Sequence, residues 1–186
     1  MPTHHANRVR IIGGAFRGRV IRFPQATRLR PTPDRVRETL FNWLGQALAG
    51  KRCLDLYAGS GALSLEAASR GAELVVALDT SRALIEALRT TANQFGAEAL
   101  EAHVGDAERF LRAERRSFDV IFADPPFDDN PWPWLLPAAS ERLAPGGYLY
   151  AEARVPLTPP PGLLDWRRDK AGQVHYHLFA RPGPAA

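Results

Sequence analysis

The tetrapeptide Asp124-Pro125-Pro126-Phe127 directly follows an apolar run and combines the side chains best suited to chemistry in this sequence. An exocyclic amine on a nucleobase is a poor nucleophile because its lone pair is delocalised into the ring. The Asp124 carboxylate and the Pro125 carbonyl could accept its two N–H bonds and aim the lone pair at an incoming methyl group, while the two prolines stiffen that carbonyl. Phe127 could stack on a base taken out of its helix or loop. The structural alternative, a strand end with an aspartate-proline turn, leaves Phe127 unexplained.

A glycine turn earlier in the chain predicts part of a nucleoside pocket. A strand runs into the turn, and the candidate residues are Asp55, Tyr57, Ala58, Gly59, Ser60 and Gly61. The two glycines permit backbone conformations closed to other residues and let a ligand approach the main chain. Ser64 stands where the dinucleotide fingerprint has its third glycine. Tyr57 could line the pocket or belong to the core.

Two further acids extend the predicted pocket. Asp79 lies 18 residues after Gly61, close to the offset of roughly 20 at which an acid reaches ribose hydroxyls. Asp106 could accept a hydrogen bond from an adenine amino group. Both aspartates could equally cap the helices that follow them. The lost third glycine and the absence of a pyrophosphate cradle favour S-adenosylmethionine over a dinucleotide.

The pattern after residue 52 predicts the elements that bring these segments together. Strands are expected at Cys53–Ala58, Leu74–Asp79, Glu101–Val104, Phe118–Ala123 and Tyr148–Glu152. Helices are expected between them at about 61–70, 81–95, 106–115 and 132–143. Strands joined by helical crossovers form a mainly parallel sheet covered on both faces, so the fold class is α/β, doubly wound. Ligands bind beyond the carboxyl ends of such strands, where all four segments lie.

Additional elements are expected at both ends of the chain. Basic and apolar residues alternate in Arg8–Ile12 and Arg19–Phe23, which predicts a β-hairpin with an arginine-lined face. A helix should follow, with Thr32 as its cap, Pro33 at its first position and Gly50 as its stop signal. Near the C-terminus, strands at Asp165–Arg168 and His175–Ala180 should form an antiparallel hairpin. We expect a basic extension over residues 1–50, a catalytic domain over 51–181 and a frayed tail over 182–186.

The charge is distributed unevenly along the chain. Residues 1–52 carry 11 basic and 2 acidic side chains, or +9, while the remaining 134 residues carry 13 basic and 18 acidic side chains, or −5. The parts sum to the net charge of +4. Arginine, whose planar fork suits phosphate and stacks on bases, supplies 22 of the 24 cations. A basic arm on a mildly acidic body favours contact with a polyanion.

Composition excludes several classes of protein. A chain of 186 residues, 45% hydrophobic and 24% charged, is typical of one globular domain. No apolar run approaches the roughly 20 residues of a membrane span, and no apolar stretch at the start indicates a secretory signal. Cys53 is the single cysteine, so an internal disulfide is impossible. His175 and His177 alternate on one strand without further ligands, and we expect no metal site. These features indicate a cytoplasmic protein, and we expect a monomer.

The sequence resembles the bacterial RsmD family of methyltransferases. The order of Asp55, the glycine turn, Asp79, Asp106 and the tetrapeptide is similar to class I S-adenosylmethionine-dependent enzymes that act on base amino groups. The narrower resemblance rests on five segments: Arg10-Ile11-Ile12-Gly13-Gly14, Arg17-Gly18-Arg19, the run from Arg30-Pro31-Thr32-Pro33-Asp34-Arg35 to Leu44, Ala58-Gly59-Ser60-Gly61-Ala62-Leu63, and Ala171-Gly172-Gln173-Val174. It extends from about residue 8 to residue 181. It implies a seven-stranded, Rossmann-like sheet and methylation of a guanine N2 amine in 16S ribosomal RNA.

The resemblance also implies a role for each matching residue. Asp55, Gly59 and Gly61 would hold the methionine end of the cofactor, Asp79 its ribose and Asp106 its adenine. The segment from Thr32 to Arg37 would close over the site, which adds Thr32 and Arg35 to the cofactor residues. Asp124, Pro125, Pro126 and Phe127 would orient the amine and stack on guanine. The residues expected to contact RNA are Arg8, Arg10, Arg17, Arg19, Arg22, Arg30 and Arg37.

Other functions stay open at this point. A DNA adenine-N6 methyltransferase would carry the same tetrapeptide, and a non-catalytic RNA-binding assembly factor could keep a vestigial pocket. An NAD-dependent oxidoreductase is a third alternative. Whether the substrate would be naked 16S rRNA or the 30S particle does not follow from the sequence.

Overall fold

A seven-stranded mixed sheet forms the centre of the computed structural model, which describes residues 7–24, 29, 31–127 and 129–184. The strand order is β5-β4-β3-β6-β7-β9-β8, with the first five strands parallel and β9 antiparallel to both of its neighbours. The strands are β3 (Arg52–Asp55), β4 (Leu74–Asp79), β5 (Leu100–Val104), β6 (Phe118–Ala123), β7 (Leu143–Ala153), β8 (Leu164–Ala171) and β9 (Val174–Ala180). The predicted doubly wound α/β fold with an antiparallel C-terminal strand is therefore confirmed.

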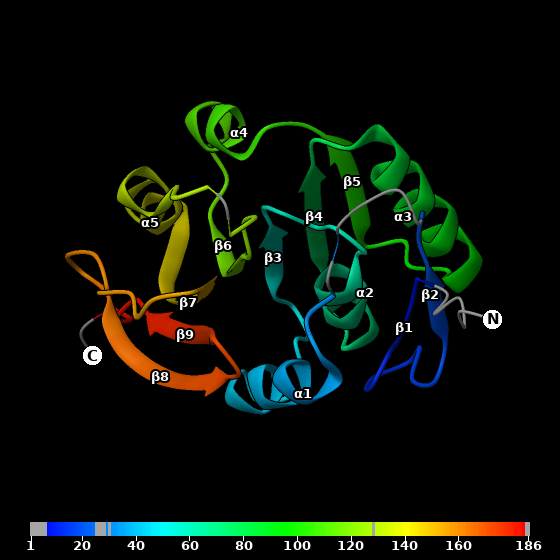
Figure 1. Cartoon of the computed structure of the whole chain (residues 1–186), viewed down its shortest axis with the longest axis horizontal. Coiled ribbons are helices and arrows are strands. Elements are labelled where there is room, and N and C mark those ends of the chain that lie inside the picture. The colour runs from blue at the N-terminus through cyan, green and yellow to red at the C-terminus, as the bar shows by residue number, and fades with distance from the viewer. Residues whose placement is uncertain (1–6, 25–28, 30, 128, 185–186) are drawn as a thin grey trace.

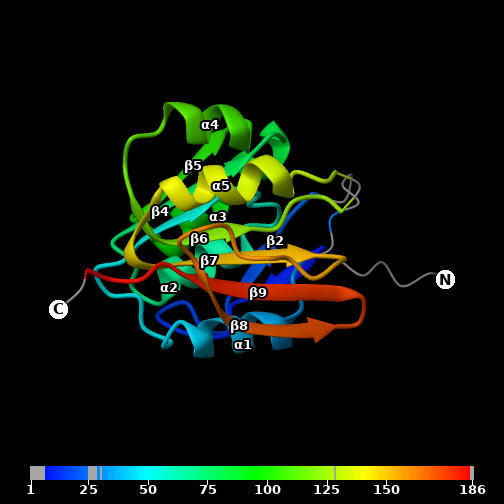
Figure 2. The same cartoon turned by 90° about the vertical axis from the view of Figure 1, so that its left-hand side faces the viewer.

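Helices cover both faces of this sheet, as Figures 1 and 2 show. One face carries α1 (Asp34–Trp43), α2 (Ala62–Ser69) and α3 (Arg82–Phe95), and the other carries α4 (Ala107–Ala113) and α5 (Trp132–Glu141). The central strands are mainly apolar because both of their faces are buried, as in Val75–Leu78 of β4, where every residue is 1% exposed or less.

A separate two-stranded hairpin, β1 (Arg8–Arg10) and β2 (Val20–Arg22), packs against α2 and α3. Its inward side chains, Val9 and Ile21, are buried, while the arginines on both strands point outward. The hairpin lies at the opposite end of the molecule from β8 and β9 (Figure 1).

Glu66 of α2 binds the segment that connects β1 to β2 and so holds the hairpin on the domain. Its carboxylate is fully buried and accepts hydrogen bonds from the backbone N–H groups of Ile12, at 3.0 Å, and Gly13, at 2.8 Å. The guanidinium groups of Arg37 and Arg70 donate to the same carboxylate. Two cations and two amides therefore surround one buried anion, and three parts of the chain meet at it.

Several element boundaries differ from the predictions. The helix predicted to run to Gly50 ends at Trp43, because Gly45 follows with φ at +88° and breaks the helical path. Thr32 does not cap α1: Pro33 is at the N-cap position, no side-chain cap bond forms, and the Thr32 hydroxyl bonds Glu152 instead. The strand predicted at Cys53–Ala58 ends at Asp55, where the glycine turn begins, and β7 and β8 extend beyond their predicted limits.

No helix among the described residues is long and apolar enough to cross a membrane.

Candidate active site

The glycine turn between β3 and α2 takes a conformation that requires glycine. Gly59 and Gly61 have φ angles of +53° and +78°. A Cβ atom on Gly61 would lie 2.4 Å from Leu88 Cδ1, so neither the backbone nor the space admits another residue. The two glycines thereby allow the chain to turn sharply from β3 into α2 and to pack closely against Leu88.

Asp55 lies buried at the end of β3 beneath this turn. Its Oδ2 accepts a hydrogen bond of 2.6 Å from the Ser64 hydroxyl. Burial raises the pKa of Asp55 to about 6, although the bond from Ser64 opposes the rise. Ser64, which occupies the place of the third fingerprint glycine, thus holds a buried carboxyl in position.

Asp79 and Asp106 follow β4 and β5 at the same edge of the sheet. Asp79 accepts hydrogen bonds from the backbone of Gly59, at 2.9 Å, and of Ser81, at 2.8 Å. The cap of α3 is Ser81, not Asp79. Asp106 does cap α4, accepting from the Arg109 N–H at 2.9 Å, and is exposed. Each carboxylate keeps further lone pairs with which it could accept ligand hydroxyl or amino groups.

The tetrapeptide begins where β6 ends, between the glycine turn and β7. Asp124 follows Ala123, which is paired with Ala151, so Asp124 comes next to Glu152 across two neighbouring strands. Burial raises the pKa of Asp124 well above its ordinary value, the negative charges of Glu152 and Asp55 raise it further, and a hydrogen bond with Thr32 opposes the rise. Two neighbouring buried carboxyls hold a shared proton more readily than two charges.

Glu152 belongs to this site, and the sequence analysis missed it. Its side chain is 5% exposed, and its Oε1 accepts hydrogen bonds from the Tyr150 hydroxyl, at 2.7 Å, and the Thr32 hydroxyl, at 3.1 Å. Burial raises its pKa, and both hydroxyls oppose the rise. One feature of the sequence could have indicated it. Burying an acid at the end of an apolar strand is unfavourable, so an acid in that position at the ligand-binding edge of the sheet points to a functional role.

Phe127 and Arg154 form the outer part of the site. The Phe127 ring is 38% exposed, and the Arg154 guanidinium lies over it at 5.1 Å from the ring centroid. Arg154 directly follows β7 and was also missed, because only the pairing of β6 with β7 brings it beside the tetrapeptide. An exposed aromatic ring with an arginine over it can stack on a base.

The remaining predicted cofactor residues lie around the same edge. Ala58 and Ser60 are buried within the glycine turn, and Tyr57 is partly buried against the core on the α4–α5 side. Thr32 reaches the site through Glu152. Arg35 is exposed on the first turn of α1. The pKa of Asp169 in β8 is lowered by hydrogen bonds from the Lys170 N–H and the Tyr176 hydroxyl, and the charge of Arg35 contributes to the same shift, so Arg35 faces the β8–β9 hairpin.

Arg37 is wrong as a predicted RNA contact. Its side chain is fully buried and donates to Glu66, to Asp34 and to the carbonyl oxygens of Thr32 and Arg10. Because the guanidinium is itself fully buried and all its hydrogen bonds go to protein acceptors, it is not available to RNA. The basic run in which it lies suggested exposure, whereas Arg37 points inward at the one buried carboxylate of α2.

The hairpin arginines are available to a partner. Arg8 and Arg22 are exposed and lie opposite each other in the β1–β2 ladder, an arrangement of like charges that is unfavourable without a counter-anion. Arg10 and Arg17 are also exposed. Arg19 is fastened at the end of α3, where it donates to the Phe95 carbonyl at 3.0 Å and lies over the Phe95 ring. The predicted contact at Arg30 lies outside the described residues.

The arrangement fits S-adenosylmethionine. The glycine turn follows β3, and Asp55, Asp79 and Asp106 lie at or just beyond the carboxyl ends of the neighbouring strands β3, β4 and β5. The described residues contain no group of three or more metal-ligating side chains.

Known proteins share both the sequence and this fold. Residues 9–180 match the protein family described as Conserved hypothetical protein 95. Ribosomal RNA small subunit methyltransferase D of Escherichia coli (strain K12) is 36% identical over 97% of this chain and 94% of its own length, and the Haemophilus influenzae protein of that name is 35% identical over 92% and 93%. Among solved structures, the yhhF protein of Escherichia coli superimposes with a TM-score of 0.86 at 37% identity, covering 95% of this chain and 99% of that one.

These likenesses extend over nearly the whole chain rather than over one motif. The predictions of a methyltransferase and of S-adenosylmethionine as its cofactor are confirmed. The chain belongs to the RsmD family, the family described as Conserved hypothetical protein 95.

Proposed function

We propose that this protein transfers a methyl group from S-adenosylmethionine to the exocyclic N2 amine of a guanine in 16S ribosomal RNA. One observation carries the proposal: the Asp124–Phe127 loop, the glycine turn and Asp79 converge on the carboxyl edge of a single sheet. The relatives named for ribosomal RNA small subunit methylation support the choice of RNA.

In this proposal, the tetrapeptide aligns the amine. Asp124 and the carbonyl of Pro125 accept its two N–H bonds, Pro126 stiffens the loop, and the guanine ring stacks on Phe127. Bound S-adenosylmethionine supplies an electrophilic methyl group on its sulfonium. The new bond forms at N2 while the bond between the methyl carbon and the sulfonium sulfur breaks, with S-adenosylhomocysteine as the product. The excess proton leaves N2 for Asp124, whose raised pKa suits a late proton acceptor. Rate enhancement comes mainly from the alignment of the two reactants.

The cofactor residues act around this loop. Asp55, Tyr57, Ala58, Gly59, Ser60 and Gly61 bind the methionine end, Asp79 the ribose and Asp106 the adenine. Thr32 positions the site through its hydrogen bond to Glu152. Residues 51–181 constitute the methyltransferase domain, and residues 1–50 form its RNA-binding extension, with Arg35 at the junction.

The hairpin arginines bind the RNA backbone. Replacing Arg8, Arg10, Arg17 and Arg19 with Ala should weaken the salt dependence of RNA binding. The slope of the logarithm of the RNA association constant against the logarithm of the salt concentration should fall in magnitude by roughly 0.7 for each lost phosphate contact to single-stranded RNA. An unchanged slope would place the RNA elsewhere on the protein.

Methyl transfer from radiolabelled S-adenosylmethionine tests the proposed reaction. Unmethylated 16S rRNA, 30S particles and duplex DNA are compared, with Asp124→Ala and, as a matched exposed-acid control, Glu98→Ala. Label on guanine N2 in either RNA sample is expected. Asp124→Ala should reduce transfer at least about 100-fold with cofactor affinity nearly intact, and Glu98→Ala should not.

Each other outcome has a defined meaning. Label on DNA alone would overturn the substrate and favour adenine-N6 methylation. Cofactor binding without label on any sample would overturn the reaction for these substrates and favour an assembly factor. Parallel loss of transfer and cofactor affinity in Asp124→Ala would overturn the role given to that carboxyl.

We also propose that the protein acts in the cytoplasm as a monomer on 16S rRNA, naked or within the 30S particle. The glycine turn, the aspartates and the tetrapeptide meet at one edge of a single sheet, so the site does not need a second copy to be complete. Sedimentation at micromolar concentration tests it, and a dimer would contradict it.

A further inference from the structure

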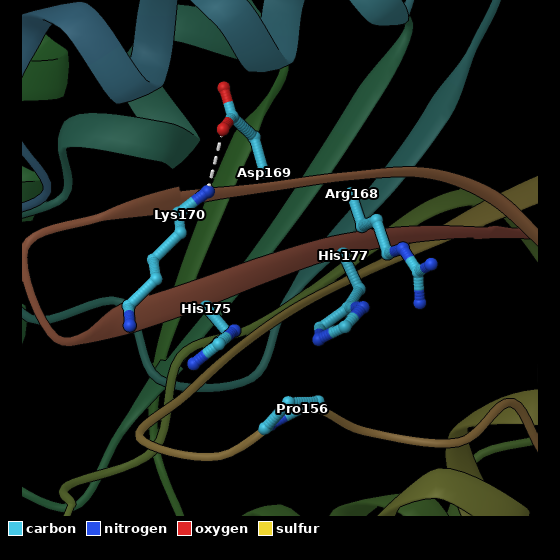
Figure 3. Close-up of a pocket in the computed structure, with 6 residues that line it drawn as sticks. All are labelled: Pro156, Arg168, Asp169, Lys170, His175 and His177. Carbon is cyan, nitrogen blue, oxygen red and sulfur yellow. Dashed lines mark hydrogen bonds between the residues drawn. The ribbon is translucent and has the colours of Figure 1, made fainter.

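A cavity of about 330 Å³ lies between the β8–β9 hairpin and the segment that follows β7 (Figure 3). The residues that line it are Pro156, Arg168, Asp169, Lys170, His175 and His177. None of them belongs to the site described above. The cavity is therefore a second recess in the molecule, and its lining is mostly basic.

The basic side chains share one face of the hairpin. Lys170 pairs with His175 and Arg168 with His177, and side chains of opposed residues lie on the same side of a sheet. Figure 3 shows these four side chains directed toward Pro156, whereas Asp169 points to the other face. There the Asp169 carboxylate accepts from the Tyr176 hydroxyl at 2.9 Å. The single acid of the lining thus faces away from the cations.

His177 contributes a donor that has no acceptor. The Leu157 N–H donates to His177 Nε2 at 3.2 Å, so the proton of the neutral ring is on Nδ1. Burial lowers the pKa of His177, which keeps the ring neutral. The residue is 1% exposed, and Nδ1 has no hydrogen-bond partner among the described residues. The ring therefore borders the cavity with one enclosed donor unsatisfied, which is unfavourable.

The two cations are only weakly neutralised by the protein. In the described part of the chain, Lys170 has no acid within ion-pair distance, and Arg168 has one exposed partner, Asp165, at 3.5 Å. Arg168 is 72% exposed, so this pair is screened by solvent. An incoming anion would compete with water more than with the protein.

The sheet register places this cavity at the edge that carries the active site. His175 pairs with Ala153, the last residue of β7, and Lys170 pairs with His175. Strand β9 lies two strand spacings from β6 and β8 lies three. At about 4.8 Å per spacing, the two strands that carry the cavity are roughly 10 to 14 Å from the strand that leads to the tetrapeptide. Arg154, over the Phe127 ring, lies on the chain segment between the two sites.

We propose that this recess, the β8–β9 cavity, binds a backbone phosphate of the RNA strand near the target guanine. The inference rests on the proposed function for its substrate. Two weakly neutralised cations and two imidazole rings on one face suit a phosphate, and the volume leaves room for part of the attached ribose. The position at the catalytic edge favours a polymer that also reaches Phe127 over a free anion. With β1–β2 at the other end of the sheet, the RNA would be held on both sides of the flipped base.

Paired double variants test the cavity through methyl transfer. Arg168→Gln with Lys170→Gln removes both cations, and Arg167→Gln with Arg115→Gln removes two exposed cations outside the cavity, Arg167 being on the opposite face of β8. The first variant should raise KM for 16S rRNA about tenfold with kcat nearly unchanged, and should reduce the salt slope by roughly 0.7 per lost contact. The control should leave both unchanged. The charge-conserving Arg168→Lys with Lys170→Arg should largely restore KM, which excludes misfolding as the cause.

Imidazole NMR of the wild-type protein provides a readout that does not need turnover. The His175 and His177 ring signals should move on titration with pentauridylate, and not with inorganic phosphate at the same phosphate concentration. Equal movement with both probes would overturn RNA in favour of a free-anion site. If the imidazole signals do not shift and the Arg168→Gln, Lys170→Gln variant keeps the wild-type KM, the cavity is not a binding site. Moving rings without methylation of 16S rRNA would leave the cavity standing and overturn the proposed function.

Discussion

Glu66 and Glu152 are both buried carboxylates, but their surroundings are opposite in charge. Glu66 has two guanidinium groups and two backbone amides around it. Glu152 has two hydroxyls, and its neighbour across the strands is another acid, Asp124. Among the described residues, no cation lies within ion-pair distance of either Glu152 or Asp124.

The difference separates a structural carboxylate from a reactive one. At Glu66 the charge is compensated, so it joins the N-terminal extension to α1 and α2 without needing to change. At the Asp124–Glu152 pair, negative charge is unfavourable because both carboxyls are shielded from water and no cation compensates them. The pKa of each carboxyl is therefore raised, and the pair binds one proton readily. A site that must receive a proton from an amine benefits from this second arrangement.

The largest expected effect comes from breaking the compensated site. Glu66→Ala leaves Arg37 buried without its main counter-charge and two amides without an acceptor, and should lower the free energy of unfolding by about 3–5 kcal/mol. Urea unfolding measures it, with the exposed Glu73→Ala as control. A loss below about 1 kcal/mol would show that the cluster does not hold the extension in place.

A third carboxylate, Asp79, sharpens the comparison because its hydrogen-bond donors are backbone amides and its proposed partner is the cofactor ribose. Asp79→Ala should weaken S-adenosylmethionine binding by roughly tenfold, or about 1.4 kcal/mol, since it removes an acceptor and frees Gly59. Isothermal titration calorimetry measures the affinity, with Glu98→Ala as control. Unchanged affinity would remove Asp79 from the ribose.

The smallest effect is expected at Glu152, where substitution should stabilise the protein instead of destabilising it. Because the folded-state pKa of Glu152 is raised, its contribution to stability is full below the unfolded pKa of about 4.3 and is lost as pH rises through the folded pKa. Glu152→Gln keeps an acceptor for Tyr150 and removes the charge. It should stabilise the protein by on the order of 1 kcal/mol at pH 8 relative to its effect at pH 4.

Thermal unfolding at the two pH values measures this difference, with the exposed Glu141→Gln as control. A variant that is destabilised more at pH 8 than at pH 4 would mean that the charge on Glu152 is compensated after all, and the contrast with Glu66 would disappear.

The sequence contained the parts of this site that depend on local pattern. The strands at Leu74–Asp79 and Phe118–Ala123 have their predicted limits because each is an apolar run with a clear stop. The segments that follow the strands lie at one edge because parallel strands require it. Asp106 caps its helix, as one of its two interpretations expected.

The parts that depend on pairing between distant segments were not predictable in this way. Glu152 and Arg154 join the site only because β7 lies next to β6, and no local pattern specifies that register. Arg37 is surrounded by exposed basic residues in the sequence, and its burial follows from the position of Glu66, 29 residues later. Thr32 has the residue type of a helix cap but bonds a glutamate 120 residues away.

The attachment of the hairpin segment to Glu66 also has a consequence for the order of events during synthesis. Ile12 is made 54 residues before the carboxylate that holds it. At roughly 5–20 residues per second, about 3 to 11 s pass before that carboxylate exists. Residues 1–33 contain no acidic side chain, so this stretch is cationic along its whole length. It is therefore synthesised next to a polyanion, the ribosome, before the carboxylate of Glu66 is available to it.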